Sequence, residues 1–269
     1  MKKILNIILI TFMALSVIFL FVFANIKQKE IICGKFEINV DYDGAPQLLD
    51  KTVVRNLITE AGIKIKGQPI ENIPVRKLTK LLNANPYIKK ATISVSVNGN
   101  VKATILQRNP LVRVVDRDFN QVIIDHEGHL MPINIDFPIR LVMANGNIQN
   151  IALSRKIAKL ASANKHHSSK LRQDQTLPED LSKVYKIALK LEADTLTSAL
   201  IEQIYINDNK EIELIPILGD QSILLGDTVA LNDKIMKLKA FYEHGMKTFA
   251  WNNYKLINLK YKNQVVCSK

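Results

Sequence analysis

The segment of this sequence that most resembles a chemical site is Asp125-His-Glu-Gly-His129, which combines imidazoles and carboxylates over five residues. Zinc hydrolases place such groups on a helix as His-Glu-x-x-His, which aligns both imidazoles on one face. Here His126 and His129 are one residue too close for that motif, and Gly128 predicts a turn between strands. No neighbouring motif supplies a further ligand. We therefore interpret His126, Glu127 and His129 as a solvated turn and assign no metal ligand.

The sequence offers no other constellation typical of catalysis. It has no Gly-x-Ser-x-Gly elbow, no Gly-x-x-x-x-Gly-Lys-Ser/Thr phosphate loop and no Gly-x-Gly-x-x-Gly motif opening a helix. His166 and His167 fall in a polar stretch, 161–178, that is typical of a surface linker. The sequence therefore predicts a protein that is not an enzyme, with no catalytic residue and no cofactor.

The positive charge of the chain does not indicate nucleic-acid binding. Lysine and arginine number 37 against 25 acidic residues, giving a net charge of +12. These basic residues are spread and interleaved with acids, without the aromatic-studded basic run that stacks bases. The pattern favours a solvated basic surface that attracts anionic lipid headgroups or an acidic partner.

The first residues predict a membrane anchor. Residues 4–24 are almost entirely apolar, and about 20 such residues cross a bilayer as a helix. The alternative, a cleaved signal peptide, has an apolar core of about 7–15 residues and a small-residue exit. Here the exit is Val22-Phe23-Ala24. The lysines on the two sides of the segment nearly balance, so charge alone does not orient it.

Two cysteines, Cys33 and Cys267, have neither a metal-like nor a redox-like spacing. They are either two incidental thiols or a disulfide joining the ends of the exported part.

The first elements after the anchor predict a small domain with helices over a sheet. Residues 36–42 alternate as a strand, residues 50–62 and 74–84 have helical stripes, and Asn85-Pro86 ends the second helix. Asn98-Gly99 is a strong hairpin signal between two further strands. The expected core face of the second helix and the hairpin is Leu78, Leu81, Ile93, Val95, Val101 and Ile105.

The rest of the chain predicts a larger α+β domain, mainly antiparallel with peripheral helices. Strands are expected on both sides of Asp116–Asn120, in 138–146, as a hairpin around Asp208–Lys210, and in 221–226. Helices are expected at 151–159, at 179–194 with Leu181, Val184, Ala188 and Leu191 inward, and around Ile235–Phe241. A final strand is expected from Leu256 to Val266.

Several of these segments together resemble one family. The run "LLNANPYIKKATISVSVNGNVKATILQRNPLVRVV" resembles the helix, hairpin and Gln-Arg-x-Pro progression of the cell-division protein FtsQ, called DivIB in other bacteria. In "NQVIIDHEGHLMPI", Asp125 and Gly128 resemble that family's Asp-x-x-Gly turn. "EIELIPILGD" and "LINLKYKNQVV" resemble its late strands. The strand-helix-helix-strand-strand order resembles a POTRA domain, a protein-docking module.

The resemblance implies an organisation and a location. It implies a cytoplasmic tail at 1–3, a transmembrane helix at 4–24, a POTRA domain at 35–108 and an FtsQ-like β domain at 109–266. The chain would then be a single-pass protein of the inner membrane at the division septum, with its N-terminus in the cytoplasm and its bulk in the periplasm.

The resemblance also implies a function and partners. The chain would be a non-enzymatic scaffold that links early and late division proteins. Single-pass partners similar to FtsB and FtsL would bind an uncovered edge formed by the final strand, and further divisome proteins would bind the POTRA domain. The implied partner-binding residues are Leu259, Tyr261, Asn263 and Val265.

Two other functions remain open at this stage. A POTRA receptor for outer-membrane assembly or secretion would share the small domain, although such proteins usually continue into a membrane barrel. A periplasmic metal-binding hydrolase built around the histidines is the second alternative.

Overall fold

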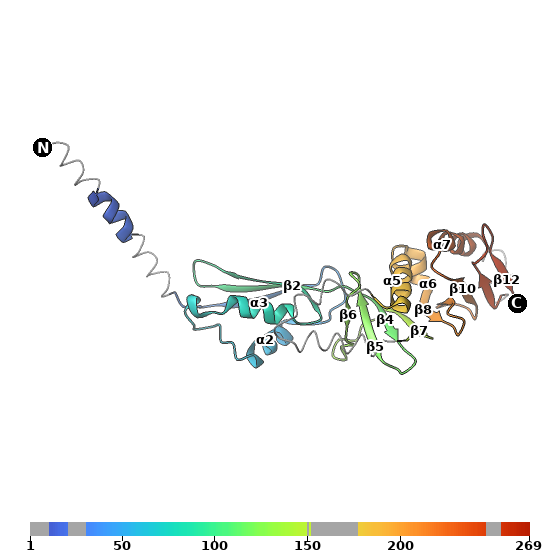
Figure 1. Cartoon of the computed structure of the whole chain (residues 1–269), viewed down its shortest axis with the longest axis horizontal. Helices are drawn as coiled ribbons and strands as arrows, with labels where there is room; N and C mark the ends of the chain where they lie inside the picture. Colours follow the sequence, from blue (N-terminus) through green and yellow to red (C-terminus); the bar gives the residue numbers. More distant parts are fainter. Residues whose placement is uncertain (1–10, 21–30, 150, 152–176, 246–253) are drawn as a thin grey trace. The chain divides into compact units, whose positions relative to one another are not determined.

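The computed structural model describes residues 11–20, 31–149, 151, 177–245 and 254–269, and its described parts form two compact units (Figure 1). Residues 11–20 are helical, and their apolar side chains, such as Phe12 and Phe19, are exposed. The rest of the expected anchor lies outside the described residues. Within the described ranges, no helix combines the length and apolarity that crossing a membrane requires. The spanning segment 4–24 therefore stays a prediction.

The first unit has the predicted element order. Its elements are β1 (Phe36–Asp41), α2 (Lys51–Glu60), a short 3-10 helix (Ile70–Asn72), α3 (Val75–Asn83), β2 (Ile88–Val95) and β3 (Val101–Gln107). The sheet order is β1-β3-β2, with β1 parallel to β3 and a turn at Asn98-Gly99 between β2 and β3. The parallel β1/β3 pair requires a long crossover, which the helices provide.

Local signals explain where α2 begins and ends. The Asp50 side chain accepts a hydrogen bond of 2.7 Å from the Val53 amide, which caps the first turn. Gly62, with φ of +68°, follows the last turn in the left-handed conformation that glycine adopts without strain. The helix buries Val54 and Ile58, and α3 buries Leu78 and Leu82.

The predicted core of this unit is partly wrong. Leu78, Val101 and Ile105 are buried as expected, but Leu81 and Ile93 are only half-buried and Val95 is exposed. Burial in β2 is confined to Ile88 and Ala91, in its first half. The strand β2 is an outer strand, and no residue is buried in the half nearest the turn. Alternation alone could not show where along β2 the burial of apolar side chains ends.

The second unit contains a mixed nine-stranded sheet of order β12-β11-β10-β9-β8-β7-β4-β5-β6. Its strands are β4 (Pro110–Val115), β5 (Gln121–Asp125), β6 (Leu130–Met131), β7 (Val142–Gly146), β8 (Ile201–Ile206), β9 (Ile212–Pro216), β10 (Ser222–Gly226), β11 (Leu256–Asn258) and β12 (Val266–Ser268). Its helices are α5 (Glu179–Glu192), α6 (Thr195–Leu200), α7 (Leu231–Ala240) and a π-helical turn (Phe241–Gly245).

The sheet is less antiparallel than the sequence predicts. The pairs β4/β7, β7/β8 and β10/β11 are parallel, whereas β4/β5, β5/β6, β8/β9, β9/β10 and β11/β12 are antiparallel. Parallel neighbours need crossover connections. The connection from β7 to β8 contains α5 and α6, and the one from β10 to β11 contains α7.

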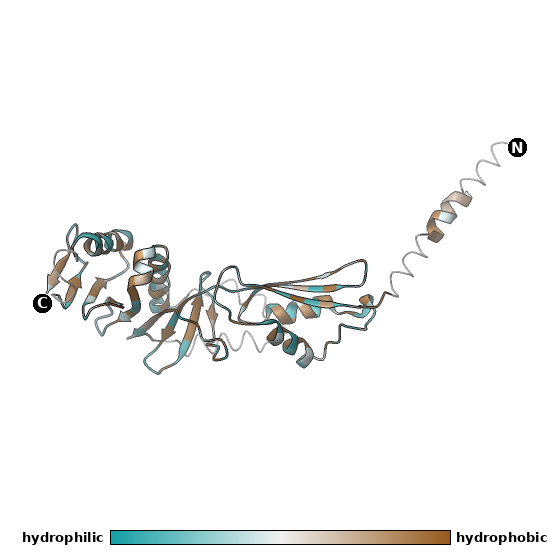
Figure 2. Ribbon diagram, turned by 180° about the vertical axis from the view of Figure 1, so that it is seen from behind, coloured by the Kyte–Doolittle hydropathy of each residue, from teal (hydrophilic) through white to brown (hydrophobic). Residues whose placement is uncertain are grey.

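The helix α5 supplies much of the core. Its predicted inward residues Leu181, Val184, Ala188 and Leu191 are all buried, together with Ile187. Figure 2 shows apolar and polar residues alternating along the ribbons of both units. In α7, Ile235 and Leu238 are buried but Met236 is exposed. The expected helix 151–159 and the polar stretch 161–178 lie almost entirely outside the described residues.

The single final strand predicted from Leu256 to Val266 is wrong. The strand β11 ends at Asn258, and a turn containing Asn263 at φ of +56° leads back into β12. Asparagine tolerates this left-handed conformation, which reverses the chain. Consequently β11 is an inner strand and β12 is the outer one.

Candidate protein-binding edge of the large sheet

The strand β12 lies at one end of the nine-stranded sheet and pairs with β11 on one side. The paired residues are Leu256 with Ser268, Ile257 with Cys267, and Asn258 with Val266. In the part of the chain that the structure describes, no strand pairs with the other side of β12. An outer strand of this kind presents backbone groups to which an extended segment of another chain can add.

The four residues predicted to bind a partner do not share one extended strand. Leu259 is fully buried and its amide donates a 2.9 Å hydrogen bond to the Leu224 carbonyl, while Val265 packs against the core. Tyr261 is 50% exposed and Asn263 is exposed, both in the turn between β11 and β12. The structure therefore places Tyr261 and Asn263 at the surface beside the outer strand, with Leu259 and Val265 beneath.

Two lysines hold this turn in place. The Lys237 ammonium in α7 donates to the carbonyls of Leu259, at 2.7 Å, and Tyr261. The Lys260 ammonium forms an ion pair with Glu211, and this hydrogen bond raises the pKa of Lys260. The Lys260 side chain also lies over Gly226, where an added Cβ would come within 2.8 Å of its Cγ. Lys260 therefore helps to position this turn.

The outer strand itself was missed by sequence reasoning. Val266 and Ser268 are exposed, and Cys267 between them is half-buried against the core. Burial raises the pKa of the Cys267 thiol. The alternation of these residues was the available signal, but the sequence before them was interpreted as one continuous strand from Leu256 to Val266. Both cysteines are free thiols.

The suspected histidine turn is organised by a buried arginine. One terminal nitrogen of Arg108 lies 2.8 Å from an Asp125 oxygen, 3.0 Å from His129 Nδ1 and 3.4 Å from a Glu127 oxygen. Arg108 and Asp125 are both buried. The other Asp125 oxygen accepts hydrogen bonds from the backbone amides of Glu127 and His129, at 2.9 and 2.7 Å. The Gln-Arg-x-Pro and Asp-x-x-Gly motifs therefore meet in one network.

The charges of this network determine how Asp125 titrates. Burial is the largest single influence and opposes ionisation of Asp125. Hydrogen bonds from His129 and Arg108, with the arginine charge, together outweigh burial and hold the pKa of Asp125 below its ordinary value.

Asp125, Glu127 and His129 have ligand atoms close enough together to surround a metal ion. The Arg108 guanidinium already lies within hydrogen-bonding distance of all three side chains and supplies the positive charge that a metal would bring. A second cation at this position would meet electrostatic repulsion from Arg108. The donor set therefore fits a structural turn better than a metal centre.

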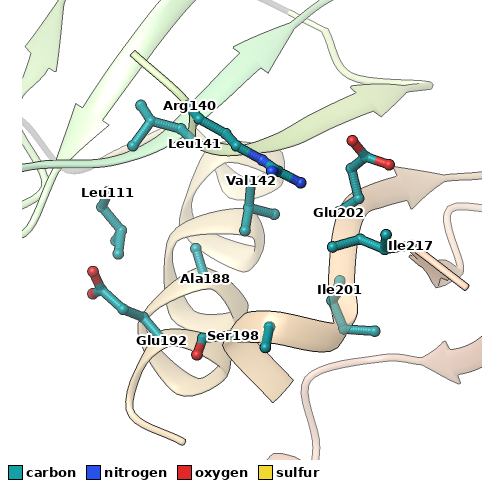
Figure 3. Close-up of a pocket in the computed structure, with 11 residues that line it drawn as sticks. Leu111, Arg140, Leu141, Val142, Ala188, Glu192, Ser198, Ile201, Glu202 and Ile217 are labelled. Carbon is teal, nitrogen blue, oxygen red and sulfur yellow. The ribbon is translucent and has the colours of Figure 1, made fainter. Parts of the chain in front are cut away.

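A groove of about 440 Å³ lies between β7, α5, α6 and β8 (Figure 3). Leu111, Val142, Ala188, Ile201 and Ile217 give it apolar walls, and Arg140, Glu192 and Glu202 supply its charged groups. Neither a histidine nor a cysteine lines this groove. Its lining suits binding and does not form a nucleophile with its base.

Comparison with known families gives two matches. Residues 109–268 match the family model described as FtsQ/DivIB, C-terminal related, and residues 31–106 match a POTRA-like domain. The first match alone covers more than half of the 269 residues. A search of curated proteins finds no match.

Proposed function

The chain belongs to the FtsQ/DivIB family, and from this premise we propose that it is a non-enzymatic divisome scaffold linking early and late division proteins. In this proposal the contacts are made in the periplasm, by a single-pass protein of the inner membrane at the septum. The unit at 35–108 docks further divisome proteins, and the β domain at 109–266 binds single-pass partners similar to FtsB and FtsL.

The observation that carries the proposal is the outer strand β12 at the end of the large sheet. An extended partner segment adds to it as a further strand and satisfies its outward backbone groups. Because β12 has only three residues, backbone pairing alone is a small contact. The exposed ring of Tyr261 adds an amphipathic anchor next to it, and aromatic residues of this type often dominate binding energy. Asn263 adds a polar contact from the same turn.

The buried members of the predicted site have a supporting role. Leu259 and Val265 pack on the core at the start and end of the turn, so they fix where Tyr261 and β12 lie. A partner would meet them only through the backbone.

The test separates the edge from the fold. A truncation after Val265 removes β12, and Tyr261→Ala removes the anchor. We expect both variants to keep the thermal unfolding of the rest of the chain but to lose capture of the FtsB/FtsL-type partner and to give filamentous cells. Phe119→Ala, which removes an exposed aromatic in the β4–β5 turn, is the matched control and should behave as wild type. Normal septation by the truncated chain would rule out this edge as the binding site.

Depletion of the whole chain distinguishes this scaffold from a POTRA receptor of outer-membrane assembly or secretion. Depletion that leaves septation intact but impairs outer-membrane proteins would support a secretion or assembly receptor instead.

A further inference from the structure

The end of the first unit that is nearest to the expected anchor carries exposed apolar side chains. Val97 is 78% exposed at the β2–β3 turn, and Ile32, just before β1, is 58% exposed. The turn lies against the segment that contains Ile32, since an added Cβ on Gly99 would come within 2.8 Å of the Ile32 carbonyl oxygen and the Ile31 side chain. Figure 1 shows the turn of this hairpin at the end of the unit where the chain enters it.

A basic groove adjoins the same entry segment. It has a volume of about 390 Å³, a floor of buried Ile58, Ile63 and Ile65, and the cations Lys35, Arg55 and Lys66 around it. No acidic residue lines it. Lys35 pairs with the exposed Glu37, whereas Arg55 and Lys66 have no ion-pair partner among the described residues. The groove therefore presents uncompensated positive charge over an apolar floor.

Backbone contacts tie the groove and the hairpin turn to the entry segment 31–35. Gly67, next to Lys66, donates a 2.9 Å hydrogen bond to the Cys33 carbonyl. On the other side, the Val101 amide donates to the Lys35 carbonyl at 2.9 Å. The entry segment is thus held between the loop that contains Lys66 and Gly67 and the β2–β3 hairpin. The groove and the hairpin turn therefore belong to one end of the unit.

The distance along the chain brings this end to the membrane. Six residues separate Ala24, the last residue of the expected anchor, from Ile31. Fully extended, seven Cα–Cα steps reach about 25 Å at most. A surface with apolar tips and unpaired cations at that range has the chemistry of the bilayer interface, where apolar groups enter the acyl boundary and cations meet headgroup phosphates.

We propose that this end of the POTRA-like unit docks on the surface of an anionic phospholipid bilayer, with Val97 and Ile32 entering the interface and Arg55 and Lys66 binding headgroup phosphates. The docking sets the orientation of the unit relative to the membrane. The inference rests on the expected anchor at 4–24 and is independent of the partner-binding edge.

The test uses the full chain in vesicles of defined composition. Trp251 is the only tryptophan, so a Trp251→Phe background allows one reporter to be placed at will. We expect Val97→Trp fluorescence to be quenched by phosphatidylcholine brominated on its acyl chains when phosphatidylglycerol is mixed in, and quenched less without it. Thr104→Trp, exposed on the same hairpin but in the middle of β3 and away from the turn, is the matched control and should not be quenched.

The contribution of the groove is tested by charge removal. Arg55→Gln with Lys66→Gln should lower the ratio of docked to undocked molecules by about 30-fold, which corresponds to about 1 kcal/mol for each basic residue near an anionic surface. Lys80→Gln with Lys90→Gln removes the same charge from exposed positions in the last turn of α3 and the first half of β2, and should change little.

Each result decides the inference. Equal quenching of tryptophan at positions 97 and 104 would overturn it, as would a chain that does not float with the vesicles. Equal effects of the two charge variants would overturn the role of the groove. If the Val97→Trp chain is quenched as expected but the wild-type chain captures no FtsB/FtsL-type partner, the proposed function is wrong and the membrane docking stands.

Discussion

Asp125 and Arg108 show how residues of a suspected chemical site serve structure instead. Their charges neutralise each other where both side chains are buried, and the second carboxylate oxygen of Asp125 holds the turn amides of Glu127 and His129. A buried ion pair of this kind contributes little net stability over an apolar pair, but removing one partner is costly. The stability of the second unit should therefore depend on the charge of Asp125.

Asp125→Asn should destabilise the second unit by about 3 kcal/mol, because Arg108 would stay buried with weaker compensation from Glu127. The free energy of unfolding in urea measures this. Glu127→Gln, which changes the exposed partner of the same arginine, is the control and should cost much less. Similar losses in the two variants would contradict the importance of the buried pair.

The lowered pKa of Asp125 also predicts a pH dependence. A carboxyl whose pKa is lower in the folded state contributes its stabilisation fully above the unfolded-state pKa, about 3.9. That contribution is lost as the pH falls below this value through the lower folded-state pKa. We expect the stability of wild type to fall more steeply over this acid range than that of Asp125→Asn, as measured by urea unfolding at a series of pH values. Parallel curves would show that Asp125 does not titrate as described.

The two thiols should differ in reactivity. Cys33 is buried, and Cys267 is half-buried with a pKa raised by burial, so its thiolate fraction at neutral pH is small. We expect maleimide to label Cys267 faster than Cys33, and both more slowly than a free cysteine, by mass spectrometry under native conditions. Bound partner should slow Cys267 further without changing Cys33. Unchanged labelling of Cys267 in the complex would speak against coverage of β12.

At the scale of elements, the hairpin β2–β3 shows that apolar alternation and burial are separable. The strand β3 is central and alternates buried Val101, Ala103 and Ile105 with residues that face outward. The strand β2 has the same alternation but loses its cover after Ala91. Tolerance to a charged substitution in these strands should follow the observed burial of each side chain and not the alternation in the sequence.

Ala103→Asp in β3 should lower stability by several kcal/mol because it buries a charge, while Thr104→Asp on the exposed face should cost little. Thermal unfolding of the two variants measures the difference. Val95→Asp should resemble Thr104→Asp, because Val95 is exposed despite its place in the alternation. A large loss for Val95→Asp would contradict the observed burial pattern.

At the scale of the whole molecule, the proposed function depends on the membrane topology of the chain. The family is shown by the match over residues 109–268, whereas the spanning segment rests on the apolar run at 4–24. The proposed scaffold function requires the folded units to be on the periplasmic side, where the partners would be bound.

A reporter active only in the cytoplasm, fused after Lys269, should therefore stay inactive, while a reporter active only in the periplasm at the same position should be active. Fusions measured in colonies provide the assay. Cytoplasmic activity at Lys269 would overturn the proposed topology and with it the periplasmic contacts.

The sequence by itself determined most of the local structure. Caps, helical stripes and turn residues predicted α2, α3, α5, β8 and β9, because each of these signals depends on neighbours within a few residues. The ordered motifs also indicated the family, which the comparisons show.

Only the tertiary structure decided which distant residues meet. The pairing of Arg108 with Asp125, the placement of β11 between β10 and β12, and the uncovered half of β2 each depend on how separate elements pack together. The final strand illustrates the reason. Its alternating residues permitted one long strand, but the turn at Asn263 allows β12 to pair with β11, while Lys237 holds the carbonyls of Leu259 and Tyr261. The pairing of β11 with β10 is a long-range contact that leaves β12 in the outer position, so the local pattern alone could not identify the outer strand.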